Sequence, residues 1–454
     1  MAKIIGFFTR NPKWCAFLIG VIFVFCNLVI ANNTRSNGRR YIFWSDAMGY
    51  YAYLPSTFIY QDLLGCSYDV DKCFKNADPN KRVIFKYTSG VAILQTPFFL
   101  TALGVSQFTE TNPDGLSETF EFCITMGTIF YCFMALLLMF SVLKRYVKTQ
   151  SAIITVILAY FGTNLFYYTI GESGMSHAYS FFTMSWFIYS VHGFLDKPTW
   201  KNSIQIGFAF GLSTIIRPTN FFIILLPFFL KIQNFKDIST RIQFLTRQPL
   251  TYLGVLFAFL AILPQLIYWK LQSGKFLFFS YSEETFVYLK NPHIADILWG
   301  NVSGLFVYTP LLLLFIPGLY FMWQKKWRFE AAIILTIFAT ITYFNASWWC
   351  YTFDCGFGHR AFIEYYPMLL IPIAFSFDVL FVKWKSVILT LILVLFFFIN
   401  IRMSYLYKKY PCWKDDWGIK WGWSNVAYVL RVVFYIDPRP TYHFRVIDKL
   451  PNTN

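Results

Sequence analysis

Long apolar runs alternate with short polar segments along almost the whole chain. A helix needs about 20 apolar residues to cross the roughly 30 Å hydrocarbon layer of a bilayer. Runs of this kind predict spans at 14–31, 121–143, 151–170, 177–195, 250–269, 303–323, 331–346, 362–382 and 386–403. Shorter apolar pieces lie at 89–108, 203–216 and 219–230. With these pieces, the pattern predicts an all-α polytopic membrane protein with about 11–12 transmembrane helices.

The composition supports this prediction. Apolar residues make up 57% of the 454 residues and charged residues 14%, against roughly 25% charged in soluble proteins. The aromatic content of 22% excludes a disordered or collagen-like chain. Because the net charge of +16 lies between the apolar runs, it indicates membrane orientation, and we expect no nucleic-acid partner.

Basic loops predict the orientation, because Lys and Arg near span ends stay on the cytoplasmic side. These loops are 144–148, 197–201, 231–247, 325–328 and 383–385. The loops expected on the opposite side are 32–88, 171–177, 270–302 and 347–361. Residues 1–403 then form one transmembrane domain, and 404–454 form an interfacial carboxyl-terminal tail. Three apolar runs, 89–108, 121–143 and 151–170, separate the loops 32–88 and 171–177, but two loops on the same side need an even number of spans between them. We therefore expect 89–108 to be a re-entrant or interfacial piece.

Four cysteines lie in two outer loops, as Cys66 with Cys73 and Cys350 with Cys355. An oxidising compartment would allow a local disulfide in each loop. Reduced thiols are the alternative, because spacing alone does not fix connectivity. The disulfide state stays open.

The first outer loop is rich in aromatic residues from Tyr41 to Pro55, so we expect a helical piece lying along the membrane surface. Asp46 is a carboxylate within this piece. Partial burial among aromatic rings predicts a raised proton affinity, which suits a general base toward a hydroxyl or an amine. A solvated or helix-capping Asp46 is the alternative.

The second outer loop holds Glu172 and His177 between two apolar runs. Ionisable groups at the end of a span need a partner or a ligand when they are buried, so both are candidates for substrate binding. A plain interfacial glutamate and a capping histidine explain them equally well.

Arg217 and Pro218 interrupt the apolar stretch from Ile204 to Leu230. Proline breaks the helix there and frees backbone groups beside a guanidinium. Arginine grips phosphate or carboxylate oxygens with two parallel hydrogen bonds, so Arg217 is a candidate anion contact. Snorkelling to the lipid headgroups is the alternative.

The last outer loop ends in Gly356-Phe357-Gly358-His359-Arg360 at the mouth of a span. The two glycines allow the backbone to approach a ligand closely. His359 and Arg360 supply donors to an anion, so both are candidates for substrate binding.

Together these elements resemble the membrane glycosyltransferases of the GT-C superfamily. The resemblance covers about residues 14–403. Its motifs are Ser45-Asp46 with Tyr53-Leu54-Pro55, Arg217-Pro218-Thr219-Asn220, Gly304-Leu305-Phe306-Val307-Tyr308-Thr309-Pro310 and Gly358-His359-Arg360. The resemblance implies a GT-C-like helical bundle that transfers a sugar from a polyprenyl-phosphate carrier, as protein mannosyltransferases and aminoarabinose transferases do. It implies a glycan, lipid or protein acceptor and contact with membrane lipid.

By the same resemblance, Asp46 is the catalytic base of an inverting transfer. Arg217, His359 and Arg360 would contact the lipid phosphate, with Glu172 and His177 in the second loop. No cofactor is assigned. The glutamate pair 283–284 is expected to be solvated, and a divalent cation bound there is the alternative. The resemblance places the protein in a bacterial inner (plasma) membrane, with its site facing the periplasm or exterior.

Two departures leave the acceptor open. Ala47 follows Asp46, where protein O-mannosyltransferases have Asp-Glu. Cys350 follows Trp348-Trp349, where oligosaccharyltransferases have Trp-Trp-Asp. En bloc transfer of an oligosaccharide to protein or lipid is therefore one alternative. A lipid or small-molecule transporter or flippase is the alternative from another class, although no inverted repeat is evident.

Overall fold

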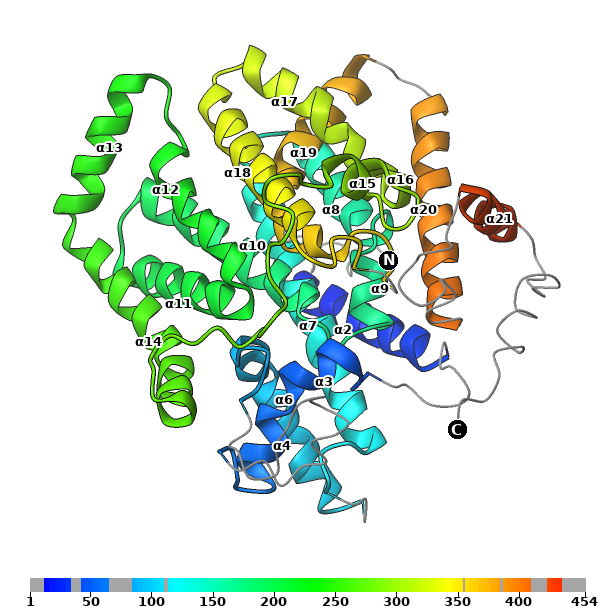
Figure 1. Cartoon of the computed structure of the whole chain (residues 1–454). Helices are drawn as coiled ribbons and strands as arrows, with labels where there is room; N and C mark the ends of the chain where they lie inside the picture. The colour runs from blue at the N-terminus through cyan, green and yellow to red at the C-terminus, as the bar shows by residue number, and fades with distance from the viewer. Residues whose placement is uncertain are drawn as a thin grey trace.

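The computed structural model describes residues 12–33, 42–64, 84–109, 113–353, 356–383, 387–409 and 423–434. Within these ranges the regular structure is helical and no strand occurs (Figure 1). Apolar runs form helices because, in lipid, a helix satisfies its own backbone polar groups. The all-α prediction is confirmed. Cys66, Cys73 and Cys355 lie outside the described residues.

The helices follow one another with short connections. The first are α2 (Pro12–Asn33), α3 (Ser45–Tyr51), α4 (Tyr53–Phe58), α6 (Gly90–Ser106), α7 (Glu118–Leu143), α8 (Thr149–Phe161) and α9 (Leu165–Ile170). The middle of the chain forms α10 (His177–Asp196), α11 (Trp200–Ile216), η1 (Pro218–Leu225), α12 (Leu226–Phe229), α13 (Phe235–Arg247) and α14 (Pro249–Ser273). The remaining elements are α15 (Ile294–Trp299), α16 (Leu305–Tyr308), η2 (Pro310–Leu314), α17 (Phe315–Gln324), α18 (Arg328–Ser347), η3 (Arg360–Tyr365), α19 (Tyr366–Lys383), α20 (Val387–Lys409) and α21 (Trp423–Phe434).

Five helical segments among the described residues are long and apolar enough to cross a membrane. They are Glu118–Leu143, Pro249–Ser273, Arg328–Ser347, Arg360–Leu380 and Thr390–Tyr407. Shorter apolar segments are Leu18–Asn32, Gly90–Ser106, Thr149–Phe161, Pro218–Phe229 and Pro310–Gln324. The chain thus has the helices of a multi-pass membrane protein, and the count of 11 or 12 spans stays a prediction.

Two predicted spans are broken. The run 151–170 divides into α8 and α9, because α8 ends at its C-cap Gly162. The run 303–323 was expected as a single helix, but it divides into α16, η2 and α17. Thr309 has a non-helical backbone (φ −134°, ψ 65°), and Pro310 starts the next element. Proline disfavours helical geometry in the residue before it, which explains the break.

Helix α10 lies in the middle of the bundle and packs against α7, α11 and α19 (Figure 1). Helix α11 also crosses α14 very closely. Gly207 and Gly211 of α11 face Gly254 and Ala258 of α14, and a methyl group on Gly211 would lie 2.6 Å from the Ala258 carbonyl oxygen. Small residues four apart allow two helix backbones to approach in lipid.

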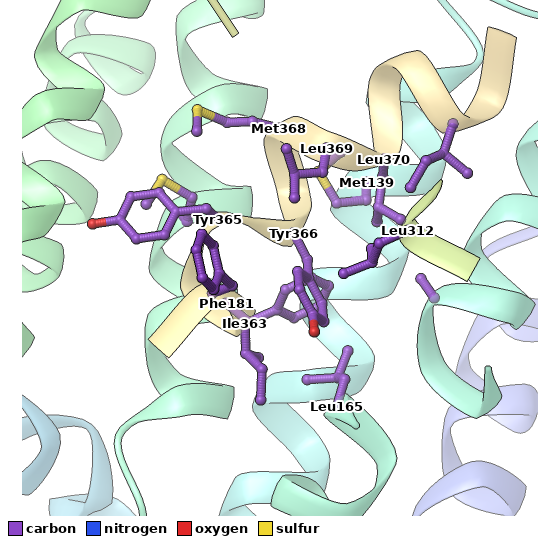
Figure 2. Close-up of a cluster of buried hydrophobic side chains, with 14 of the residues drawn as sticks. Met139, Leu165, Phe181, Leu312, Ile363, Tyr365, Tyr366, Met368, Leu369 and Leu370 are labelled. Atoms are coloured by element: carbon purple, nitrogen blue, oxygen red, sulfur yellow. The ribbon is translucent and has the colours of Figure 1, made fainter. Parts of the chain in front are cut away.

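The start of α19 is anchored in the apolar core. Ile363, Tyr365 and Tyr366 are buried together with Phe181 of α10 and Leu165 of α9 (Figure 2). Interlocked side chains tolerate little movement, because protein interiors are close-packed. The core therefore fixes η3, which begins at Arg360, against α10.

Candidate functional site

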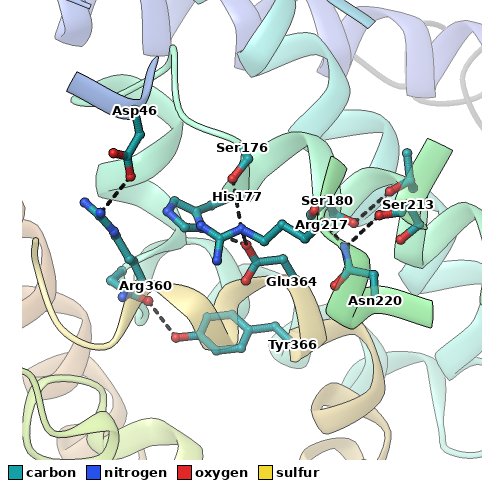
Figure 3. A network of polar contacts seen from close by, with 12 residues as sticks. Asp46, Ser176, His177, Ser180, Ser213, Arg217, Asn220, Arg360, Glu364 and Tyr366 are labelled. Atoms are coloured by element: carbon teal, nitrogen blue, oxygen red, sulfur yellow. Dashed lines mark hydrogen bonds and ion pairs between the residues drawn. The ribbon is translucent and has the colours of Figure 1, made fainter. Parts of the chain in front are cut away.

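Four of the six predicted site residues come together in space, namely Asp46, His177, Arg217 and Arg360 (Figure 3). Each lies at the end of a helix. Asp46 is in the first turn of α3, His177 begins α10, Arg217 follows α11 and Arg360 begins η3. Helix ends from distant parts of the chain therefore build one polar cluster.

Asp46 is not a helix cap. Trp44 is the N-cap of α3 and makes no side-chain capping bond. Ser45, the residue before Asp46, has φ +47°, a left-handed conformation that costs energy for any residue other than glycine. Strained backbone of this kind persists where the surrounding structure enforces it, and here it accompanies the turn that directs Asp46 inward.

Three donors contact the Asp46 carboxylate, and the longest of these bonds is from the Ser45 hydroxyl to Oδ1 at 3.4 Å. Arg360 Nη2 lies 2.9 Å from Oδ2, and the Tyr87 hydroxyl donates to Oδ1 at 2.6 Å. Burial and the neighbouring Asp46 charge raise the pKa of Tyr87 well above its usual value, so the phenol stays protonated and donates. The carboxylate is thus fixed at both oxygens.

The charge of Asp46 is stabilised by its surroundings. Burial alone would raise its pKa, but the Arg360 guanidinium and the Tyr87 hydroxyl outweigh burial and hold the pKa below its usual value. Lys86 and Arg217 add to this lowering. The expectation of a raised proton affinity is therefore wrong for this arrangement, and Asp46 is an ionised, weakly basic carboxylate while Arg360 holds it.

A second group of charges centres on Glu364. Its Oε1 lies 3.1 Å from Arg217 Nε and 2.9 Å from His177 Nδ1. The side chains of Glu364 and His177 are 0% and 1% exposed, and that of Arg217 is 18% exposed. Such a carboxylate is tolerated because two partners compensate its desolvation. This arrangement excludes a capping role for His177.

Arg217 points inward, contrary to the snorkelling alternative. Its Nε also donates to Ser176 Oγ at 3.2 Å. The Arg-Pro-Thr-Asn turn is secured by Asn220, whose amide donates to Ser180 Oγ and to the Ser213 carbonyl, each at 3.1 Å. The break after α11 therefore places the guanidinium against Glu364.

The other two predicted residues lie beside this cluster. Glu172 is buried and accepts a 2.7 Å hydrogen bond from Tyr167. His359 is fully buried with Nε2 3.0 Å from the Tyr351 carbonyl oxygen, so Nε2 carries the proton and Nδ1 has none to donate. Burial lowers the pKa of His359 to about 3, which keeps the ring neutral at pH 7. His359 orders the loop and offers an anion no donor at Nδ1.

The glycines before Arg360 act as expected from their lack of a side chain. Gly358 has φ +63°, a conformation that favours glycine. A methyl group on Gly356 would lie 2.5 Å from the Tyr168 hydroxyl and 3.4 Å from Arg360 Cδ. Gly356 therefore makes room for Tyr168 beside Arg360.

Sequence reasoning missed Glu364 and Tyr87. Glu364 stands inside an apolar run, and an acidic residue there is itself a signal, because it needs a cation nearby. Tyr87 ends the first outer loop and carries no such signal. Glu284, expected to be solvated, instead forms a 2.5 Å ion pair with Lys86.

Metal ligands do not cluster in the part of the chain that the structure describes. No three His, Cys, Asp or Glu side chains there are arranged to hold an ion. The pairing of Glu284 with Lys86 also removes one oxygen ligand from the glutamate pair. A divalent cation stays a prediction without structural support.

Helix α10 separates the cluster from the basic loops. It is 20 residues long, beginning at His177 in the cluster and ending at Asp196. Asp196 forms ion pairs with Arg145 and Lys231, which belong to two of the basic loops. At about 1.5 Å per residue the two ends are roughly 30 Å apart, the thickness of a bilayer core.

Comparison with known proteins adds no further assignment: the chain matches no protein-family model and no characterised protein.

Proposed function

We propose that the protein is a membrane glycosyltransferase of the GT-C type, which moves a sugar from a polyprenyl-phosphate carrier to an acceptor. The observation that supports this proposal most is the Asp46–Arg360 pair, 2.9 Å apart and largely shielded from water. Sugar transfer from a lipid phosphate needs a carboxylate to accept a proton and a cation to stabilise the leaving phosphate. Asp46 and Arg360 supply this combination.

The transfer proceeds in one displacement. An acceptor hydroxyl or amine attacks the anomeric carbon and gives its proton to Asp46. The bond from that carbon to the phosphate oxygen breaks at the same time, and its electron pair leaves with the phosphate. Because attack and departure occur on opposite faces of the carbon, the configuration inverts. Arg360 stabilises the charge of the leaving phosphate by direct contact, and Arg217, which stays paired with Glu364, adds its positive charge nearby.

Placement at a helix end suits a lipid-linked donor. The isoprenoid stays in the hydrocarbon layer, while its phosphate reaches cations at the boundary and the acceptor arrives from water. The cluster lies at the end of α10 opposite the basic loops, which supports a site on the non-cytoplasmic side. In this proposal the chain forms a GT-C-like bundle with the expected 11 or 12 transmembrane helices. Glu172 and His177 line the site.

Transfer in reconstituted vesicles tests the proposal. The donors are a panel of polyprenyl-phosphate hexoses and pentoses, and release of free polyprenyl phosphate in the presence of cell-envelope acceptors is measured. We expect Asp46→Asn to lower the rate by at least about 100-fold, the usual contribution of a general base. Asp196→Asn, at the opposite end of α10, is the matched control and should retain the rate.

The outcomes separate the alternatives. Transfer by Asp46→Asn at the wild-type rate would remove Asp46 as the base. Movement of the intact lipid-linked sugar between leaflets, without release of polyprenyl phosphate, would favour a flippase instead. Release only from lipid-linked oligosaccharides would favour en bloc transfer.

A further inference from the structure

We infer that the donor phosphate binds by displacing Asp46 from Arg360, so that seating of the donor also releases the base. This inference rests on the proposed function and adds the order of its steps. It assigns the phosphate contact to Arg360, whereas Arg217 keeps its own carboxylate.

The cations of the cluster and Lys86, whose charge also acts on Asp46, are already paired. Three carboxylates oppose three cations, in the pairs Lys86–Glu284 at 2.5 Å, Arg217–Glu364 at 3.1 Å and Arg360–Asp46 at 2.9 Å. An incoming phosphate therefore meets no uncompensated cation among these six groups. It must replace one of the carboxylates to make a charge-assisted contact.

Burial selects the pair that exchanges. Glu364 is 0% exposed and is also held by His177, so its release from Arg217 would leave a buried charge without a counter-ion. Asp46 and Arg360 are 22% and 14% exposed, so a ligand can reach their pair and Asp46 can be solvated when it is displaced. The Lys86–Glu284 pair is more exposed, but opening it would release neither oxygen of Asp46 and so would not free the base.

Arg360 also has unused hydrogen-bonding capacity. It contacts Asp46 through Nη2, whereas its Nε is buried and has no partner among the described residues. A guanidinium binds phosphate best with two parallel donors. Two phosphate oxygens can accept hydrogen bonds from two N–H groups of the guanidinium, whereas Asp46 accepts one from Nη2 alone.

The exchange changes the chemistry of Asp46. Once Arg360 turns to the phosphate, Asp46 Oδ2 loses the donor that the structure gives it, while Oδ1 keeps its bond to Tyr87. Oδ2 can then take the proton of the acceptor as its oxygen or nitrogen bonds to the anomeric carbon. The base therefore becomes effective only when a donor phosphate is present, which limits futile reaction of the empty site.

Binding of sugar-free undecaprenyl phosphate in detergent micelles tests the inference separately from transfer. Asp46→Asn removes the competing charge, so we expect it to bind at least about fivefold tighter than the wild type although its transfer rate is much lower. Arg360→Gln should bind at least about fivefold more weakly, and Asp46→Asn should give no gain in its background. Undecaprenol, which lacks the phosphate, should bind the wild type and Asp46→Asn equally.

Two controls keep the test interpretable. Asp196→Asn should leave the affinity unchanged, and Asp46→Ser replaces Asp46→Asn if that variant does not fold. Equal or weaker binding of undecaprenyl phosphate by the Asp46 variants would overturn the inference and leave the proposed function standing. Absence of binding by every variant, together with absence of transfer, would overturn both.

Discussion

Replacing Glu364 with glutamine tests how far the second group of charges stabilises the protein. Glutamine has nearly the same shape as glutamate but no charge, so Arg217, with 18% of its side chain exposed, loses its counter-ion. Removing one partner of a buried ion pair costs about 3–5 kcal/mol. Because the Glu364 side chain is 0% exposed, water cannot replace it, and we expect a loss of unfolding free energy in that range.

Unfolding in mixed micelles with increasing sodium dodecyl sulfate, followed by tryptophan fluorescence, measures this loss. The matched variant is the double change Glu364→Gln with Arg217→Met, which removes both charges. Replacing both members of a buried pair is often nearly neutral, so the double variant should recover at least about half of the loss. A loss below about 1 kcal/mol for Glu364→Gln, or no recovery in the double variant, would refute the reasoning.

Two further predictions concern packing and acid. Gly318→Ala should cost about 1–3 kcal/mol of unfolding free energy, because the added methyl group would overlap the Pro372 carbonyl where α17 packs on α19. Gly104→Ala is the control and should cost nothing, because the space around Gly104 is open. Asp46 has a lowered pKa, so its ion pair should stabilise the fold above the usual value of 3.8 and be lost as the pH falls through the lowered value. Melting temperatures of the wild type and Asp46→Asn should therefore differ at pH 7 and converge in acid; a constant difference contradicts this.

The helices were largely predictable from the sequence, because lipid requires a continuous apolar surface. The expected spans 121–143 and 177–195 correspond closely to α7 and α10. The break in 303–323 was missed, since an average over a long apolar run conceals the effect of one proline. Local backbone preference at Thr309 and Pro310 overrides hydropathy there.

The site was predictable only in part. Asp46, Arg217 and Arg360 stand out as charged residues at the ends of apolar runs, and the structure does bring them together. Their pairing was not predictable, because the choice between Asp46 and Glu364 for each arginine depends on how distant helices pack. Tyr87 is one of 30 tyrosines, and no sequence pattern marks the one that reaches Asp46.

The long separation of Asp46 from Arg360 bears on how the protein is made. The two residues are 314 positions apart, and a ribosome adding roughly 5–20 residues per second needs about 16–63 s to connect them. Throughout that interval Asp46 must remain hydrated, because an unpaired charge in lipid is costly. The Asp46–Arg360 pair can therefore form only after most of the chain has been made, and a chain that stops before residue 360 has no Arg360 to pair with Asp46.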